Sequence, residues 1–435
     1  MEIRCSSASH KPLVLIALTA WIVIATAPSH AATGTTWWVA NKGLDSPSCG
    51  VRSKPCRSIS AAIEKASDGD VIEVGAGLYG DLNGDGAFTA PGEEHFNENE
   101  SCIICISKAI TLLSLHGAEK TTIDAGNGRR PATNNVAWVD SIVSITASGV
   151  TLGGPGAGFT ITGGGTGVVV GGTAADIKVI DNIARDNVFQ GFFLQVIDEN
   201  TPPFPVPVRL YTFRGNVAAG NSVGFTVVHD ETNDVPTRVL MTGNTVSGNT
   251  VTTVNGAPLP SIGFDLRGRG FELQLIGNVV ANNQGIGILV AGQGYQIRNN
   301  SVLGNAAEGI LIDGRSQPAA GDVQITGNTI VGNIGAGIIL LAGPTGNVIR
   351  GNNIWGNWGA GSIAAAPPLG SFLNCGVVND GGGGPVPATD VTNNFWGSAT
   401  GPGPDPADNA GKGCDFNGGV TIVKPFATTE FAINP

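Results

Sequence analysis

Charged residues are scarce in this sequence, and their scarcity limits what the chain can bind. Asp, Glu, Lys and Arg make up 13% of the 435 residues, and the formal net charge is −11. A negative chain with so few cations is not expected to bind nucleic acid non-specifically, so no nucleic-acid partner is predicted. An acidic polymer would need a local cluster of arginines to hold it.

The sequence also lacks the composition of a disordered chain. Such a chain would carry a higher net charge and less Ile and Val than this one. Glycine is abundant instead, with 66 residues. Abundant glycine with little charge suits short strands that are joined by many turns.

After its N-terminal segment, the sequence has no apolar stretch long enough to span a bilayer. An apolar run at residues 13–27 follows Arg4 and Lys11 and precedes a small-residue cleavage site at Ala31. This order predicts a secretory signal over residues 1–31 and a secreted or periplasmic protein. A membrane anchor is the alternative, although the run is short of the roughly 20 residues that a span needs.

Zinc-binding cysteine spacing is absent, because the chain holds one CxxC motif and not two. Removing Cys5 with the signal leaves six of the seven cysteines. An even number in an exported chain favours disulfides, and six cysteines permit fifteen connectivities. Sequence order favours the pairs Cys49–Cys56, Cys102–Cys105 and Cys375–Cys414.

One pattern recurs through residues 177–361: an apolar residue, an Asn, a second Asn five residues on, then Gly and alternating apolar residues. Repeats of roughly 20–35 residues are typical of a solenoid. The seven Asn pairs are Asn182/Asn187, Asn216/Asn221, Asn244/Asn249, Asn278/Asn283, Asn300/Asn305, Asn328/Asn333 and Asn352/Asn357. The glycine that follows them is Gly191, Gly224, Gly263, Gly287, Gly309 or Gly337.

The apolar residues after each repeat glycine alternate with a period of two, which predicts β-strands with one face inward. Each coil should hold two or three short strands, and like strands should stack in parallel roughly 4.8 Å apart. The Asn and Gly columns are expected at bends, because both residues tolerate left-handed backbone angles and a stacked Asn can bond to the next coil.

These repeats resemble the right-handed parallel β-helix of the pectate-lyase-like proteins over most of the mature chain. The predicted fold class is an all-β, single-domain solenoid, with a short N-terminal capping helix indicated by the helical spacing of residues 58–66. The predicted divisions are a signal peptide at 1–31, an N-terminal cap and first coil at 32–102, coils at 103–363, and a loop excursion with a closing cap at 364–435.

A candidate calcium loop lies in the predicted cap. Carboxylate, amide and carboxylate oxygens alternate at Asp81, Asn83 and Asp85, and a glycine follows, as in the first half of an EF-hand loop. The closing acid belongs at the twelfth position, which is Gly92, and Glu93 and Glu94 follow it. We expect Ca²⁺ here in a structural role; the alternative is an Asx- and Gly-rich surface turn.

Charged residues gather on one predicted outer face, at positions two, four and six after the repeat glycine. The predicted patch consists of Asp265, Arg267, Arg269, Asp313 and Arg315, beside a loop that carries Asp230. Neighbours in such a column lie about one strand spacing apart, close enough to share a sugar unit. The alternative is a set of ordinary surface ion pairs, which are common and contribute little.

The resemblance implies a polysaccharide substrate, and a lyase acting on an acidic polysaccharide is the leading hypothesis. Lytic β-elimination of a uronate needs a base, a cation at the carboxylate and an acid at the leaving oxygen. In pectate-lyase-like enzymes the base is often Arg or Lys, so Arg267, Arg269 and Arg315 are candidates. A glycosidase would instead pair carboxylates, such as Asp265 with Asp313 or Asp230.

The motifs of polygalacturonases, alginate epimerases and pectate lyases are missing, so no activity transfers residue by residue. A non-catalytic surface protein that binds glycan or serves as a scaffold is the alternative, because this fold supports many functions. The sequence does not indicate an oligomeric state.

Overall fold

The computed structural model describes residues 34–126, 140–197, 208–229, 236–254, 257–315, 320–357, 375–384, 386–403 and 414–433. They belong to one unit, Gly34–Pro435. The predicted signal at 1–31 and the predicted boundary at 363 lie outside the described residues, and the predicted divisions stay predictions. No helix in the described part of the chain is long and apolar enough to span a bilayer.

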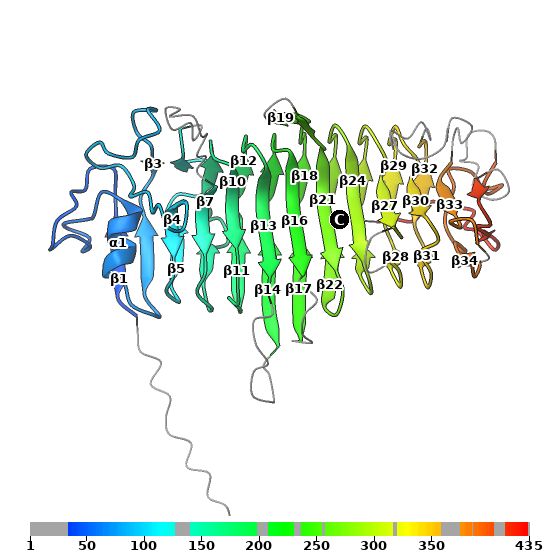
Figure 1. Cartoon of the computed structure of the whole chain (residues 1–435), viewed down its shortest axis with the longest axis horizontal. Helices are drawn as coiled ribbons and strands as arrows, with labels where there is room; N and C mark the ends of the chain where they lie inside the picture. Colours follow the sequence, from blue (N-terminus) through cyan, green and yellow to red (C-terminus); the bar gives the residue numbers. More distant parts are fainter. Residues whose placement is uncertain are drawn as a thin grey trace, which may run out of the picture. The chain divides into compact units, whose positions relative to one another are not determined.

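Three parallel sheets run side by side along the unit (Figure 1). The 13-stranded sheet contains β1 (Thr36–Val39), β2 (Val71–Val74), β5 (Thr111–Ser114), β8 (Thr151–Gly153), β11 (Ile177–Ile180), β14 (Arg209–Arg214), β17 (Thr237–Thr242), β22 (Glu272–Ile276), β25 (Gln296–Arg298), β28 (Gln324–Thr326), β31 (Val348–Arg350), β34 (Thr389–Asp390) and β36 (Thr421–Ile422).

The 11-stranded sheet contains β4 (Cys102–Ile106), β7 (Ser141–Ile145), β10 (Thr166–Val170), β13 (Gln190–Val196), β16 (Val223–His229), β21 (Ile262–Gly268), β24 (Ile286–Gly292), β27 (Ile310–Asp313), β30 (Ile338–Leu341), β33 (Val377–Asp380) and β35 (Asp415–Phe416). The 10-stranded sheet contains β3 (Gly77–Gly80), β6 (Thr121–Asp124), β9 (Thr160–Thr162), β12 (Ile183–Arg185), β15 (Val217–Ala219), β18 (Thr245–Ser247), β23 (Val279–Ala281), β26 (Ser301–Leu303), β29 (Thr329–Val331) and β32 (Asn353–Trp355). A short antiparallel hairpin, β19 (Thr252–Val254) with β20 (Ala257–Leu259), stands apart from these sheets.

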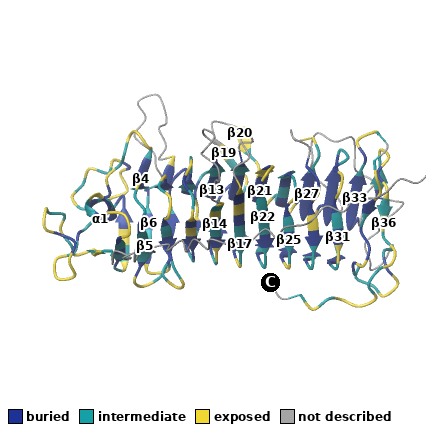
Figure 2. Cartoon of the chain, turned by 90° about the horizontal axis from the view of Figure 1, so that it is seen from below, coloured by how far each residue is buried: buried dark blue, intermediate teal, exposed yellow. Residues whose placement is uncertain are grey.

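Neighbours within a sheet belong to successive coils, so each coil contributes one strand to each sheet along most of the stack. This arrangement is a parallel β-helix, and it confirms the predicted all-β solenoid. The alternating residues point into a continuous core, where the rings of Phe192, Phe225 and Phe264 stack with centroids 4.5 and 5.1 Å apart. Figure 2 shows this burial as a dark band along the strands.

The Asn columns form two buried ladders. In the first ladder, Oδ1 of Asn244 accepts from the backbone N of Asn216 at 2.9 Å, and its Nδ2 donates to the carbonyl of Phe213 at 3.0 Å. The predicted bond from each Asn to the next coil is therefore confirmed. The left-handed residues are those before each Asn, such as Asp181 (φ 55°) before Asn182 and Asp186 (φ 56°) before Asn187, so the backbone reason that we gave for Asn belongs to its neighbour. The expectation that the repeat glycines lie at left-handed bends is also wrong, since Gly191 lies within β13 and has no positive φ.

The predicted capping helix is α1 (Ile59–Lys65), which packs against β1, β2 and β4. Ser58 is its N-cap, and the buried carboxylate of Glu94 accepts from the backbone N atoms of Ile59 and Ser60, both at 2.7 Å. These bonds satisfy N–H groups that a helix start leaves unpaired.

All three predicted disulfides are present, with Cα–Cα distances of 4.8 Å for Cys49–Cys56, 5.7 Å for Cys102–Cys105 and 6.1 Å for Cys375–Cys414. Disulfides are typical of proteins from oxidising compartments, which indicates an extracellular protein.

Candidate functional site

Two Asp–Arg pairs lie on the outer face of the 11-stranded sheet. On β21, Nε and Nη2 of Arg267 donate to the two carboxylate oxygens of Asp265 at 2.8 and 2.9 Å. Asp313, at the end of β27, accepts from Nε and Nη2 of Arg315, both at 2.9 Å. Each pair joins residues two apart; Asp265 and Arg267 both lie on β21 and point to the same side of it, whereas Arg315 lies beyond the end of β27.

The strand register brings the two pairs into one patch. Arg267 lies beside Ala291 of β24, and the register of β24 with β27 places Asp313 next in that column. The small alanine leaves Arg267 and Asp313 facing one another across two strand spacings, roughly 10 Å. The predicted grouping of Asp265, Arg267, Asp313 and Arg315 is what the structure shows.

The register adds a residue on a later coil that our sequence reasoning missed. Asp313 pairs with Leu341 of β30, and Asp380 at the end of β33 follows in the same column. The negative charge of Asp380 helps to raise the pKa of Arg315, after the larger effect of its hydrogen bond to Asp313. Asp380 lies four residues after Gly376, as Arg267 does after Gly263, so that glycine was the available signal.

The pKa shifts of Arg267 and Asp313 argue against the base and acid roles that were predicted for them. The hydrogen bond to Asp265 raises the pKa of Arg267, which makes this guanidinium a poorer base. Burial favours the neutral form of Asp313, but hydrogen bonds from Arg315 and the charge of Arg267 outweigh it and lower the pKa of Asp313. A glycosidase acid needs a raised pKa, so Asp313 is poorly suited to that role.

The remaining predicted residues lie away from the strands. Arg269 follows the end of β21, between Gly268 (φ 105°) and Gly270 (φ 77°), and it is exposed in the turn. Arg315 likewise follows the end of β27. The position six after the repeat glycine is thus a turn position and not the strand position that we expected. Asp230 lies outside the described residues.

The candidate calcium loop brings three carboxylates together. Asp81, Asp85 and Glu93 can each place one oxygen within 4.8 Å of the others. Glu93, one position after Gly92, is the carboxylate that lies with Asp81 and Asp85, and it accepts from the backbone N atoms of Leu82 and Ala90, while Glu94 caps α1. Asn83 and Asp81 also support the turn, since Oδ1 of Asn83 accepts from the backbone N of Asp85 at 2.8 Å and Asp81 accepts from those of Gly84 and Gly86. Hard carboxylate oxygens fit Ca²⁺, and its binding stays a prediction.

Residues 262–388 match the family described as right handed beta helix region. This chain is a right-handed parallel β-helix protein. No curated protein matches it in sequence.

Several solved β-helix structures are similar to this protein at low identity. The Dettilon tailspike protein gp208 is 16% identical, with a TM-score of 0.48, over 84% of this chain and 64% of its own, so this chain spans less than two thirds of that relative. Pectate lyase Pel9A is 14% identical over 92% of this chain and 80% of its own, with a TM-score of 0.39. The A-module of the Azotobacter vinelandii mannuronan C-5 epimerase AlgE6 is 15% identical over 86% and 94%, with a TM-score of 0.39. At these values the matches carry no inference about a reaction.

Proposed function

We propose that this protein is an exported carbohydrate-active protein that holds an acidic polysaccharide across the Asp–Arg patch, with lytic β-elimination as its reaction. The patch is defined as Asp265, Arg267, Arg269, Asp313, Arg315 and Asp380. The observation that carries the proposal is the pair of positioned, half-exposed guanidiniums: the side chains of Arg267 and Arg315 are 52% and 45% exposed.

Positioned guanidiniums suit carboxylate recognition. Each of the two arginines uses Nε and Nη2 on its own aspartate, which leaves Nη1 and its hydrogens directed away from that pair. Guanidinium–carboxylate hydrogen bonds are charge-assisted and strongly directional. A chain of uronates running along the stack would meet Arg267 and then, two coils later, the group around Arg315.

The three roles of a lyase divide unevenly among these residues. Neutralising the uronate carboxylate fits Arg267 and Arg315, because a raised pKa keeps them cationic. Proton abstraction falls in this proposal to Arg269, the remaining arginine of the patch, and solvent water protonates the leaving oxygen. Because the contacts in this proposal join guanidiniums to carboxylates, binding should weaken as salt rises.

A screen of pectate, alginate and glycosaminoglycans, with Ca²⁺ or a chelator, tests this proposal. Lysis produces unsaturated ends that absorb in the ultraviolet. The wild type should increase the absorbance of one of these polymers. In Arg267→Ala/Arg269→Ala the rate of that increase should be at least a hundredfold lower, because removing one charge-stabilising donor costs about 10²–10³ in rate. Arg185→Ala is the matched control, since the Arg185 side chain is also paired with an aspartate and is 53% exposed, but lies on β12.

A non-catalytic glycan-binding scaffold is the second candidate. The raised pKa of Arg267 favours this binding role. A guanidinium that stays protonated can bind a carboxylate but is poorly suited to act as a base. Retention of the protein on a polymer that shows neither ultraviolet absorbance nor new reducing ends would select this function over lysis.

Export is part of the proposal and has its own test. The three disulfides support passage through an oxidising compartment. N-terminal sequencing of protein recovered outside the cytoplasm should begin at Ala32, after cleavage at the predicted site. Recovery of the uncleaved chain in a membrane fraction would favour the anchor.

A further inference from the structure

The three disulfides differ in how much of the chain they tie together. The sequence separation is 39 residues for Cys375–Cys414, 7 for Cys49–Cys56 and 3 for Cys102–Cys105, which lies within β4. A disulfide stabilises a fold more as the loop that it closes grows. Both cysteines of β4 are already held by the register of β4 with β7. The Cys102–Cys105 bond is therefore expected to contribute least to the stability of the fold.

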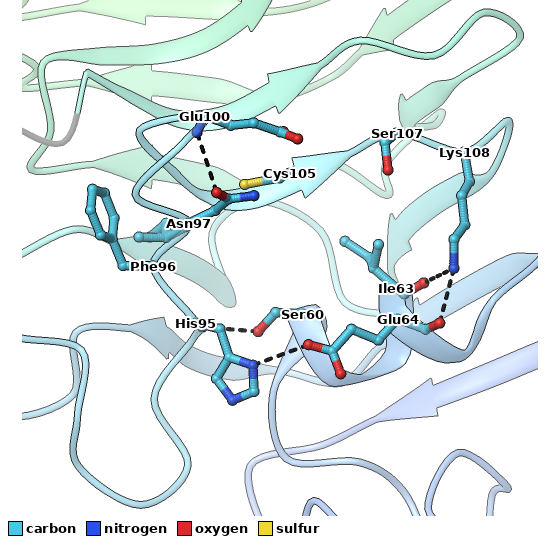
Figure 3. Close-up of a pocket in the computed structure, with 11 residues that line it drawn as sticks. Ser60, Ile63, Glu64, His95, Phe96, Asn97, Glu100, Cys105, Ser107 and Lys108 are labelled. Carbon is cyan, nitrogen blue, oxygen red and sulfur yellow. Dashed lines mark hydrogen bonds and ion pairs between the residues drawn. The ribbon is translucent and has the colours of Figure 1, made fainter.

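The same disulfide differs from the other two in access. Cys105 is half-buried, whereas Cys102 is 0% exposed and the four cysteines of the other pairs are at most 3% exposed. Cys105 lines a pocket of about 390 Å³ among α1, the loop at 95–100 and β4, and Cys102 does not line it (Figure 3). This volume is within the range of small-molecule sites. A small molecule in the pocket therefore reaches Cys105 and not Cys102.

The walls of this pocket carry charges of both signs. Nζ of Lys108 donates to three backbone carbonyls at the end of α1, at 2.6 to 2.9 Å, and keeps its positive charge there. Glu64 lies 3.3 Å from Nδ1 of His95, and Glu100 is a second carboxylate of the wall. Such walls suit a small polar molecule, and an uncharged molecule is the simplest probe of them.

We propose that Cys102–Cys105 is a thiol–disulfide exchange site for a small-molecule thiol, with Cys105 as the attacked sulfur. The incoming thiolate bonds to Sγ of Cys105, and the electron pair of the S–S bond leaves with Sγ of Cys102, which takes a proton from water. A second thiolate attacks the sulfur of the bound thiol and expels Cys105 as a thiolate. Two small thiols are thereby oxidised to one disulfide, and the protein pair is reduced. The proposal does not depend on the glycan function.

Glu100 lies where the released sulfur of Cys102 can be held. Its Oε2 is 3.8 Å from Sγ of Cys102, a distance at which a thiol S–H can donate weakly to a carboxylate. A neighbouring negative charge favours the thiol over the thiolate. The opened pair therefore consists of a buried, protonated Cys102 and an accessible Cys105, so Cys105 is also the sulfur that reacts when an oxidised thiol closes the pair again.

Differential alkylation of the native mature protein tests the proposal. When 2-mercaptoethanol is added without denaturant, Cys102–Cys105 should open at least tenfold faster than the two buried pairs, because the thiol must reach a sulfur to attack it. Mass spectrometry of the trapped thiols measures each rate. Cys49–Cys56 and Cys375–Cys414 are matched controls within the same molecule. Opening of either control pair as fast as Cys102–Cys105 would overturn the proposal.

Two serine variants locate the attacked sulfur. Cys102→Ser leaves Cys105 as a free thiol, and Cys105→Ser leaves Cys102. With bis(2-hydroxyethyl) disulfide, Cys102→Ser should form the mixed disulfide at least tenfold faster than Cys105→Ser. Equal rates in two variants that melt as the wild type does would refute the role of Cys105. If either variant unfolds, the mixed disulfide trapped in the wild type at limiting 2-mercaptoethanol decides: its position on Cys105 supports the proposal, and its position on Cys102 overturns it.

Discussion

At the scale of single residues, two buried glutamates show how differently the same group can be accommodated. Burial raises the pKa of Glu94, but donors from Ser60 and Ile59 oppose that effect and use the carboxylate as a helix cap. Burial also raises the pKa of Glu308, and neither of its carboxylate oxygens has a hydrogen-bond partner in the structure described. Glu308 is therefore a destabilising feature at neutral pH.

We predict that Glu308→Gln stabilises the protein at pH 7 and reduces its loss of stability with rising pH. The folded-state pKa lies above the ordinary value of 4.5, so folding keeps a proton that the unfolded chain releases. That contribution is complete below pH 4.5 and is lost as pH rises through the folded-state pKa. Melting temperatures measured at several pH values in both proteins check this. A variant that melts lower than the wild type at pH 7, with an unchanged pH profile, would contradict it.

At the scale of elements, the Asn ladders are the units that lock one coil to the next. Asn244 serves both sides, because its Oδ1 accepts from the backbone N and Nδ2 of Asn216 while its Nδ2 donates to the carbonyl of Phe213 and to Asn278. Removing this side chain leaves several buried groups unpaired. Each unpaired group costs about 1–3 kcal/mol.

We therefore predict that Asn244→Ala lowers the free energy of unfolding by about 2–5 kcal/mol, because at least two buried groups lose their partners. Chemical denaturation measures this loss. The control is Asn41→Ala, since Asn41 is exposed and lies outside the ladder. A loss in Asn244→Ala no larger than that of the control would show that the ladder contributes little.

The calcium loop is a second element with a measurable effect. If Asp81, Asp85 and Glu93 hold Ca²⁺, the ion should raise the free energy of unfolding by about 2.7 kcal/mol when its concentration is 100 times the Kd. Thermal melts with Ca²⁺, with Mg²⁺ and with a chelator check this, and Asp85→Asn should abolish the Ca²⁺ effect. Asp124→Asn, which changes a carboxylate outside the three-residue set, is the control. Identical melts in Ca²⁺ and chelator would leave the loop as an ordinary Asx-rich turn.

The elements also show how far sequence reasoning reaches. The coils were predictable because the Asn, Gly and apolar columns repeat at fixed local spacing, and the Asp265–Arg267 pair follows from the two-residue period of a strand. Asp380 and the ladder residue Asn394 were missed, because their coils lack the paired Asn signature. Positions beyond the strand ends, such as Arg269 and Arg315, depend on turn geometry that a periodic pattern does not specify. The pocket among α1, the loop at 95–100 and β4 arises from distant segments without any repeat.

At the scale of the whole unit that begins at Gly34, the stacked coils place repeated sequence positions in rows that run along one face. Each coil presents the same position on the same face, so charges separated by 46 residues, as in Arg267 and Asp313, become neighbours two coils apart. A polymer is a natural ligand for such a surface, because its own repeat can follow the stack.

Binding of a fluorescent acidic oligosaccharide, such as an oligogalacturonate or an oligoalginate, measures recognition at the patch most directly. The wild type should bind one of these ligands in a salt-sensitive manner, and Arg185→Ala should match it. Arg267→Ala/Arg315→Ala should bind at least tenfold more weakly, because it removes two charge-assisted contacts. Equal affinity of the double variant and the wild type would show that the polysaccharide does not lie across the Asp–Arg patch.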